Sequence, residues 1–596
     1  MQTFISATLI DYAVLGNIKI EPLGSWCVPT SDLFPNSDYS SKLYTTGFVE
    51  RRIVFQYIAN LYDRIMPAFS SQMNSYHNTN FTDDQWENIC GYWLLCVLNA
   101  TFFRWQKIED IAIKYSNLTL IICERSKDFN QRFHTMQDSR ISYNHEFNSF
   151  LCEKIATYFD KIKIVKSKLN YEEVLSGQEI IPKRKTKLLY FTTWKFAQIK
   201  KLFFDNLIVR TGFFARQGLI VMTHWNSLRD LIWLMYRIKK PIFISHLNIP
   251  DNPSNTKVRD IALATFIAND EFEKFLKQNL MSFVPISVLS DFKLNIAKIQ
   301  KAKWDFSPKL LISDTNHTGG NDLMRIWFGL YGNNKKQLNV VQHGGAYGEM
   351  ELQWSLHFEN RISNKFYCWG WAERKNNPLK FSNIPSLRLL KTRKKKMRST
   401  DNLIVMLLFP EYNYSFLPLH SQPSNRDEHI LNLEFLSSFI TALNKKENLA
   451  VKPQNSNYTV TTEFIKKFHP NIYLGNVDIF KNSQDCRVLI STYNGTNTLE
   501  CFTSGIPTIL IWDKRFFHPN EEAKKYLLNL EKAGVLYFDA VAAAEFLNLD
   551  HKFIDKWWLE NEVQEAVNEY LDHFGSTKGG SKEFSKIIAT AWKSKN

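Results

Sequence analysis

The stretch from residue 487 to residue 513, RVLISTYNGTNTLECFTSGIPTILIWD, contains two short apolar runs separated by a turn and an amphipathic segment. The first run ends in Ser491 and Thr492, and the second run is PTILIWD. A strand, a helix and a second strand in this order form a βαβ unit, in which the two strands are parallel. The stretch therefore predicts an α/β fold with a parallel sheet in the C-terminal part of the chain.

The same alternation extends over most of the chain. From about residue 117, apolar runs alternate with amphipathic segments, and the runs are LTLIICE, KLLYFTTW, GLIVMTHW, KPIFISHL, KLLISD, LNVVQHGG and KFYCWGW. After residue 400 the pattern resumes with DNLIVMLLFP, NLAVKP and NIYLG. Strands that alternate with helices predict mostly parallel sheets. We therefore expect two Rossmann-like domains of unequal size.

A basic segment separates the two patterns. Residues 391–400, KTRKKKMRST, include six Lys or Arg residues, none of which would enter a core. We interpret the segment as a solvated linker between an N-terminal domain, 1–390, and a C-terminal domain, 401–596. Docking on anionic lipid is the alternative. Residues 50–115 are expected to form a helical elaboration of the N-terminal domain, with a helix start at Thr82, and the last helix of the chain can pack back on that domain.

The composition is that of a globular protein, and 596 residues are too many for a single hydrophobic core. The net charge of +15 favours anionic ligands. No nucleic-acid partner is expected, however, because the sequence has no zinc-finger spacing, no RNP-type strand and no basic heptad arm. The eight cysteines are scattered without a CxxC pair, which is typical of buried thiols in a reducing compartment.

These features predict a cytoplasmic protein. The segment MQTFISATLIDYAVLG has no basic region and an early acidic residue, unlike a signal peptide. The longest uncharged stretch, Ile89–Phe103, is shorter than a membrane-spanning helix requires. Peripheral association with the inner face of the cytoplasmic membrane, an anionic surface, stays open as an alternative.

The turn within the 487–513 stretch has the composition of an anion-binding site. It lies between a strand and a helix, where backbone N–H groups and the helix dipole point at a ligand. The candidate ligands of a donor nucleotide are Ser491, Thr492, Asn494, Gly495, Thr496 and Glu500. Hydroxyl groups would donate to a phosphate, and a carboxylate can accept hydrogen bonds from ribose hydroxyls. The alternative is that the Asn and Thr side chains only cap the helix and that Glu500 completes a capping box.

A second turn follows a predicted strand of the N-terminal domain, in the segment LNVVQHGGAYGE. Because ligands bind beyond the carboxyl ends of parallel strands, Gln342, Gly344 and Gly345 are expected to line a cleft, where glycine allows close approach or a positive φ. His343 is a candidate acid, base or phosphate ligand. Glu349 is a candidate for deprotonating a sugar hydroxyl or attacking an anomeric carbon. A surface acid at a helix start is the alternative for Glu349.

A third polar cluster, SDTNHTGGND, follows the predicted strand KLLIS. Sequential parallel strands end on one side of a sheet, so this cluster can line the same cleft. Asp314 and His317 are its candidate acid/base residues. An ordinary loop is the alternative, since Asp, Asn, Thr and Gly are common in loops.

The chain lacks the signatures of several other enzyme classes. It has no HExxH, no DxD between strands, no Walker A sequence, no GxGxxG and no GxSxG. These absences argue against metal sites, ATPases, dehydrogenases and α/β-hydrolases. Neither a metal nor another cofactor is expected.

Two motifs carry a family resemblance. VVQHGGAYGE and LISTYNGTNTLECFTSGIPTILIWD together resemble the transferase family found in bacterial O-antigen and surface-carbohydrate gene clusters, as do LGSWC at Leu23–Cys27 and WLLCVLNATFFRW. A looser similarity extends to GT-B glycosyltransferases that use CMP-activated keto sugars (Kdo and sialic-acid transferases) and to CDP-glycerol glycerophosphotransferases. The resemblance covers most of the chain, and it implies a GT-B-like fold in which two Rossmann-like domains face a cleft.

The resemblance also implies a metal-independent glycosyltransferase. Such an enzyme would move a sugar from a nucleotide-activated donor, for example a CMP-keto sugar, onto a growing surface polysaccharide or a lipid-linked saccharide. The donor nucleotide would contact the C-terminal turn, and His343 and Gly344 would lie at the reaction centre. Lys452 would neutralise a phosphate, although Gln454 stands where many of these transferases carry a histidine.

Three other functions stay open at this point. A glycerophosphotransferase would use a CDP-glycerol donor, and the sequence does not separate it from a sugar transferase. A non-catalytic carbohydrate- or lipid-binding scaffold would bind no nucleotide. A two-domain GT-B epimerase would need a nucleotide sugar but no acceptor, which leaves the aromatic, basic N-terminal half without a use.

Overall fold

The computed structural model describes the chain in segments. They are residues 3–8, 11, 20–28, 48–125, 129, 136, 144–170, 219–222, 228–238, 242–243, 261–372, 380–392, 403–408, 411, 423, 425–452, 459–469, 471–474 and 486–595. The predicted strand KLLYFTTW and all of the predicted linker beyond Thr392 lie outside the described residues.

In the described part of the C-terminal domain, six strands form one sheet with parallel pairing throughout. They are β11 (Leu403–Leu407), β12 (Leu449–Lys452), β13 (Tyr473–Leu474), β14 (Cys486–Ser491), β15 (Thr508–Ile511) and β16 (Leu536–Tyr537). Their order, β13-β12-β11-β14-β15-β16, is that of a Rossmann fold. The predicted βαβ unit is confirmed, because helix α20 (Thr496–Ser504) connects β14 to the neighbouring β15.

A second parallel sheet forms the N-terminal domain. Its described strands are β5 (Leu219–Met222), β6 (Ile242–Phe243), β7 (Leu310–Ser313), β8 (Leu338–Val341), β9 (Lys365–Cys368) and β10 (Phe381–Asn383), in the order β10-β9-β8-β7-β5-β6. The two sheets confirm the α/β fold class and the GT-B-like pair of Rossmann-like domains.

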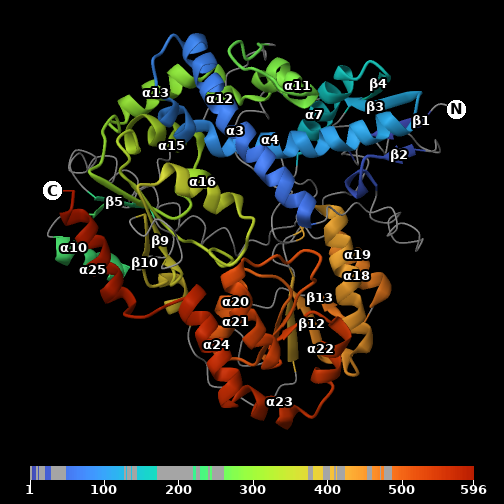
Figure 1. Ribbon diagram of the computed structural model, residues 1–596, viewed down its shortest axis with the longest axis vertical. Helices are drawn as coiled ribbons and strands as arrows, with labels where there is room; N and C mark the ends of the chain where they lie inside the picture. The colour runs from blue at the N-terminus through green and yellow to red at the C-terminus, as the bar shows by residue number, and fades with distance from the viewer. Residues whose placement is uncertain are drawn as a thin grey trace, which may run out of the picture.

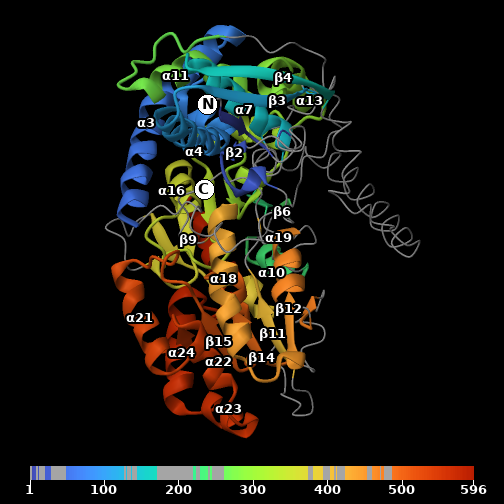
Figure 2. The same cartoon turned by 90° about the vertical axis from the view of Figure 1, so that its right-hand side faces the viewer.

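The N-terminal elaboration contains a sheet as well as helices. Strands β1 (Thr3–Ser6), β2 (Ile20–Pro22), β3 (Leu118–Glu124) and β4 (Ile162–Asn170) form a parallel sheet in the order β2-β1-β3-β4, with helices α3 (Phe48–His77), α4 (Asp83–Lys114) and α7 (His145–Tyr158). The strand LTLIICE therefore belongs to this separate sheet. Figure 2 shows the sheet at one end of the molecule, the C-terminal domain at the other and the N-terminal domain between them.

Helix α4 begins where the sequence predicts a helix start. The hydroxyl of Thr82 accepts a hydrogen bond from Gln85 N, and the Gln85 side chain accepts one from Thr82 N, which completes a capping box. Most of the side chains that follow, from Trp86 to Trp105, are buried in the protein core. None of the described helices is long and apolar enough to cross a membrane.

Further helices lie on both sides of the linker. Before it are α10 (Leu228–Ile238), α11 (Glu271–Asn279), α13 (Phe292–Lys301) and α16 (Trp354–Ile362), and after it are α18 (Arg426–Ala442), α19 (Thr459–Phe468), α21 (Glu521–Lys532), α22 (Ala540–Leu547), α23 (His551–Trp558), α24 (Asn561–Phe574) and α25 (Gly580–Lys593).

The chain joins the two domains twice. It passes from α17 (Leu387–Leu390) to β11, and it returns from α24 to α25, which packs beside α10 in the N-terminal domain (Figure 1). Backbone hydrogen bonds fix the return: Ser576 N donates to Trp369 O at 2.7 Å, and Ser386 N donates to Ser576 O at 2.8 Å.

A second contact between the halves lies at the start of α18. Asp427 Oδ1 accepts a hydrogen bond from Ser25 N at 2.9 Å, and Glu428 forms a buried ion pair with Arg51 of α3. Buried ion pairs need good geometry to offset desolvation. The start of α18 is therefore held against the N-terminal elaboration by groups that are buried only while the two halves are together.

Candidate functional site

The two glycine-containing turns that follow β8 and β14 touch each other. Gly345 N donates a hydrogen bond to Thr496 Oγ1 at 2.9 Å. A Cβ atom on Gly345 would lie 2.4 Å from the carbonyl carbon of Gly495, and one on Gly344 would lie 2.9 Å from Thr496 Oγ1. The backbone at Gly344 and Gly345 is not in the positive-φ region. Glycine is required here because the backbones of two domains approach closely.

His343 stands beside this contact. Its ring packs edge-on against the Tyr347 ring, with 5.1 Å between the centroids, and its side chain is 29% exposed. Burial lowers the pKa of His343 below its ordinary value, and the carboxylates of Glu359 and Asp314 oppose that shift. The shift favours the neutral imidazole, which is the form that can accept a proton.

A buried carboxylate lies behind His343. Glu359, on α16, has a side chain that is 1% exposed, and its Oε1 lies 3.7 Å from His343 Nδ1. Tyr347 donates a hydrogen bond to Glu359 Oε2 at 3.0 Å. His317 Nε2 lies 3.6 Å from Glu359 Oε1 on another side. Glu359 thus connects the two predicted histidines, although the sequence analysis missed it.

The third predicted cluster reaches the same edge of the sheet. Ser313, the last residue of β7, pairs with Val340 of β8, so the residues that follow both strands lie side by side. His317 Nδ1 lies 3.1 Å from Ser313 Oγ, and the Asp314 and His317 side chains are buried. The structure therefore brings together His317, Asp314 and His343, three of the four predicted acid/base residues.

Glu349 lies elsewhere, at the contact between the domains. It accepts a hydrogen bond from the hydroxyl of Tyr570, on α24, at 2.7 Å, and its side chain is buried. Its backbone oxygen accepts a hydrogen bond from Asn520 N at 2.9 Å. These contacts are those of a residue that joins the domains, and they contradict the alternative of a surface acid.

The side chain of Gln342 holds the turn after β8 in place through three hydrogen bonds. Its Oε1 accepts hydrogen bonds from Trp369 N at 2.9 Å and from Trp371 Nε1 at 2.7 Å, and its Nε2 donates to Gly344 O at 2.8 Å. The side chain is buried. Gln342 therefore fixes the path of the turn that carries His343.

The polar side chains of the C-terminal turn hold that turn in shape. Ser491 Oγ lies 2.9 Å from Thr498 Oγ1, and Thr492 Oγ1 donates to Leu407 O at 2.8 Å. Asn494 Nδ2 lies 3.2 Å from Met350 Sδ of the N-terminal domain. Their hydrogen bonds orient the start of α20 toward the N-terminal domain.

The capping interpretation of this turn is wrong. Gly495 is the N-cap residue of α20, and none of the described side chains caps the helix. Glu500 instead pairs with Arg388 of α17, with 2.7 Å between Oε1 and Nε. The N-terminus of α20 therefore keeps the dipole character of an uncapped helix.

Lys452 shares an edge of the sheet with the turn. Leu407, at the end of β11, pairs with Lys452 on one side and with Ser491 on the other. Three neighbouring strands thus end together, and the predicted lysine and the predicted turn lie at the carboxyl edge where Rossmann folds bind ligands.

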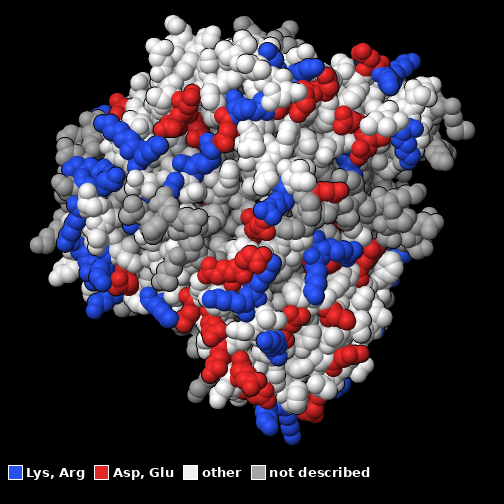
Figure 3. Space-filling view, in the orientation of Figure 1, with Lys and Arg blue, Asp and Glu red and all other residues white. Residues whose placement is uncertain are grey.

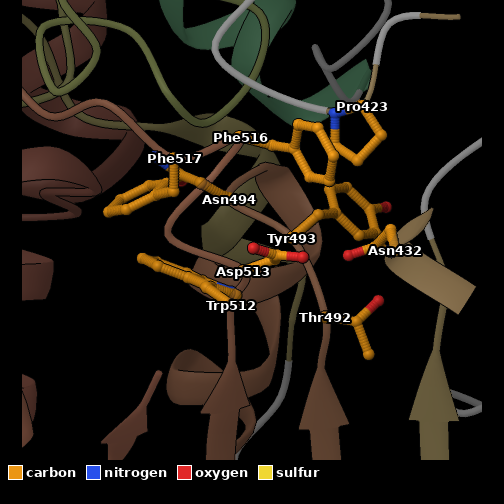
Figure 4. A pocket seen from close by; sticks show the side chains of 9 residues that line it. All are labelled: Pro423, Asn432, Thr492, Tyr493, Asn494, Trp512, Asp513, Phe516 and Phe517. Atoms are coloured by element: carbon orange, nitrogen blue, oxygen red, sulfur yellow. The ribbon is translucent and has the colours of Figure 1, made fainter. Parts of the chain in front are cut away.

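An aromatic pocket that the sequence analysis missed lies beside the turn (Figure 4). Its lining residues are Pro423, Asn432, Thr492, Tyr493, Asn494, Trp512, Asp513, Phe516 and Phe517. The rings of Tyr493 and Phe516 lie next to Pro423 on one side of Asp513, and Trp512 and Phe517 lie on its other side. The signal in the sequence was WDKRFF, directly after the strand PTILI. Aromatic side chains of this kind can stack on a planar base, but the space between them is about 10 Å³, which is room for one water molecule.

The described residues contain no group of His, Cys, Asp and Glu side chains that could hold a metal ion.

Several solved structures are similar to the chain. The wall teichoic acid polymerase TagF, in a structure with CDPG, is 10% identical, with 69% of this chain and 99% of that chain covered and a TM-score of 0.31. MnaA from S. aureus, in a structure with UDP, is 12% identical, with coverages of 64% and 96% and a TM-score of 0.34. MurG from Acinetobacter baumannii is 10% identical, with coverages of 63% and 99% and a TM-score of 0.29. These values describe a distant likeness of fold and assign no residue a role.

No curated protein sequence matches the chain. A family model, in contrast, matches residues 8–586, which is nearly the whole chain and includes both turns, the cluster around Glu359 and the contact between the domains. The protein is a member of the LIC12162 family of transferases.

Proposed function

We propose that this transferase moves a sugar from a nucleotide-activated donor to a saccharide acceptor of a surface polysaccharide such as O-antigen. The observation that carries the proposal is the position of the His343 imidazole, against the buried carboxylate of Glu359 and in the turn that contacts the start of α20. A proton acceptor and an anion-binding element, supplied by different domains, are the two parts that glycosyl transfer requires.

The donor nucleotide would occupy the C-terminal domain. The start of α20 and Lys452 lie at the carboxyl edge of the sheet, where positive potential favours a phosphate. The aromatic pocket next to Thr492 and Asn494 has room for about one water molecule, about 10 Å³, so Tyr493 and Phe516 would have to move apart to receive a base between them. The hydroxyls of Ser491 and Thr492 keep this edge in shape, and Glu500 is held by Arg388.

The acceptor hydroxyl would approach His343. Its oxygen attacks the anomeric carbon while the bond from that carbon to the donor phosphate breaks, and the phosphate oxygen keeps the electron pair. The hydroxyl proton moves to His343, which becomes an imidazolium ion. Glu359 stabilises that ion at 3.7 Å, in the way that a buried carboxylate assists a histidine base in hydrolases.

The experiment that tests the proposal is a thermal-shift screen of the purified protein against CMP, CDP, UDP, GDP, ADP and dTDP. A nucleotide that binds only the folded protein at about 100 times its Kd adds about 2.7 kcal/mol to the free energy of unfolding, so the melting temperature rises. A Phe516→Ala variant should lose the shift, while Phe553→Ala, an exposed phenylalanine on α23, should keep it. If no nucleotide raises the melting temperature of well-folded protein, the proposal is wrong.

A further inference from the structure

A second pocket lies outside the candidate site, between helix α25 and the β10-β9-β8-β7-β5-β6 sheet of the N-terminal domain. Its volume is about 400 Å³, within the range of pockets that hold small ligands. The strands β8, β9 and β10 form its floor, and α25 forms one wall. We call it the α25 pocket and define it by Asn339, Lys365, Tyr367, Ser382, Lys586 and Thr590.

The floor of the α25 pocket is polar, which is unusual for this position. Asn339 pairs with Lys365, and Tyr367 pairs with Ser382, so these four side chains share one face of the sheet. Parallel sheets are normally apolar on both faces. Asn339 and Tyr367 are 2% and 1% exposed and are hydrogen-bonded within the floor. Asn339 Nδ2 lies 3.4 Å from the Tyr367 hydroxyl, and Asn364 Nδ2 donates to Asn339 Oδ1 at 3.3 Å. The polar groups that a ligand can reach are those of Asn364, Asn383 and Thr590, which are exposed.

The wall adds hydroxyl groups and positive charge. Lys586, Thr590 and Ser594 recur at every fourth position of α25 and its end, and all three line the pocket. Lys365, Lys586 and Lys595 line it together with a single carboxylate, that of Glu583, which lies 3.3 Å from Lys586. Lys and Arg side chains gather along the edge of the molecule where α25 lies (Figure 3). The pocket thus carries a positive charge in excess.

We propose that the α25 pocket binds an acidic saccharide, a sugar chain that bears carboxylate, sulfate or phosphate groups. The amides of Asn364 and Asn383 and the hydroxyl of Thr590, which are exposed in the pocket, match sugar hydroxyls, because each of them can donate and accept hydrogen bonds. The ammonium groups of the lysines pair with the acidic groups.

The pocket and the candidate site share strand β8. Asn339 comes four residues before His343, which corresponds to roughly 13 Å along an extended chain. One rigid domain would hold both positions at a constant separation. The role that this suggests, retention of the acceptor chain while its end reacts at His343, depends on the proposed function, whereas the binding itself does not.

The test measures fluorescence anisotropy of a labelled heparin tetrasaccharide with the full-length protein at 0.15 M salt. Lys586→Glu should weaken binding by about tenfold or more, because a charge is reversed within the pocket. Lys532→Glu makes the same change at an exposed position of α21, in the C-terminal domain, and should alter the Kd less than about twofold, since such charges are screened. Thr590→Trp, which fills the pocket without a change of charge, should also weaken binding.

Binding of a neutral saccharide and the nucleotide thermal-shift screen separate specific binding in the α25 pocket from general charge attraction and from the proposed function. Labelled maltotetraose, a neutral chain of the same length, should bind more weakly than the heparin tetrasaccharide. Equal losses in Lys586→Glu and Lys532→Glu would show general attraction to a basic protein and would overturn the inference. Tetrasaccharide binding that Thr590→Trp leaves unchanged would also overturn it. If the tetrasaccharide binds in the pocket while no nucleotide shifts the melting temperature, the inference stands and the proposed function falls.

Discussion

At the scale of single residues, the site depends on one carboxylate that the sequence did not indicate. Asp314, His317 and His343 follow strand ends, so their position in a parallel sheet could be predicted. Glu359 lies on α16, sixteen residues beyond His343, in a segment that resembles an ordinary amphipathic helix. Its contact with both histidines arises from how α16 packs on the sheet, and no local pattern encodes that packing.

We expect Glu359→Gln to reduce kcat/KM by about 100-fold. A general base contributes on that order, and the imidazolium form of His343 would lose its counter-charge. Activity requires neutral His343, so it should fall as pH decreases through the pKa of His343. The carboxylate of Glu359 raises that pKa. The acid limb of the pH profile should therefore move to lower pH in the variant.

The matched control is His357→Gln on the same helix, where the side chain packs against Phe55 of α3 instead. That variant should keep both the rate and the acid limb. An acid limb that stays in place in Glu359→Gln would exclude Glu359 from the support of His343.

At the scale of elements, the two glycine turns were recognised from the sequence, but their relation to each other was not. Strands, turns and helices follow from local periodicity, which explains why β8, β14 and α20 were foreseen. The contact of Gly345 with Gly495 and Thr496 joins residues 150 positions apart, and such a distance leaves no mark in local pattern. The aromatic pocket was missed for a similar reason, since its rings come from separate loops.

We expect Gly345→Ala to lower the free energy of unfolding by about 1–3 kcal/mol, as overpacking does in other cores. The added Cβ would lie 2.4 Å from the carbonyl carbon of Gly495, so one backbone would have to move. Urea unfolding measures the loss. Gly319→Ala serves as the comparison, because a Cβ there meets no atom within 4 Å. Equal stability of the two variants would mean that the turns do not touch in solution.

At the scale of the whole molecule, the domains are held together by buried polar groups as well as by apolar packing. The pair of Tyr570 and Glu349 is buried, and its members come from different domains. The sequence predicted the two domains from their alternating strands and helices. It did not reveal the parallel sheet of the N-terminal elaboration, since two of its strands, β1 and β2, have only four and three residues.

We expect Tyr570→Phe to cost about 1–3 kcal/mol, because the buried carboxylate of Glu349 loses a hydrogen bond. Combined with Glu349→Gln in a double-mutant cycle, the two changes should show a coupling of about 0.5–3 kcal/mol. Thermal unfolding of the four proteins gives that coupling. Strict additivity would show that the pair contributes nothing to the union of the domains.

The place where the chain returns to the N-terminal domain has a mechanical consequence. Ser386 and Ser576 bind each other there, so the described ends of both connections lie side by side. The contacts of Arg51 with Glu428 and of Ser25 with Asp427 lie at the start of α18. Any rotation that separated α18 from the N-terminal elaboration would break these contacts and expose the buried ion pair of Arg51 and Glu428 to water.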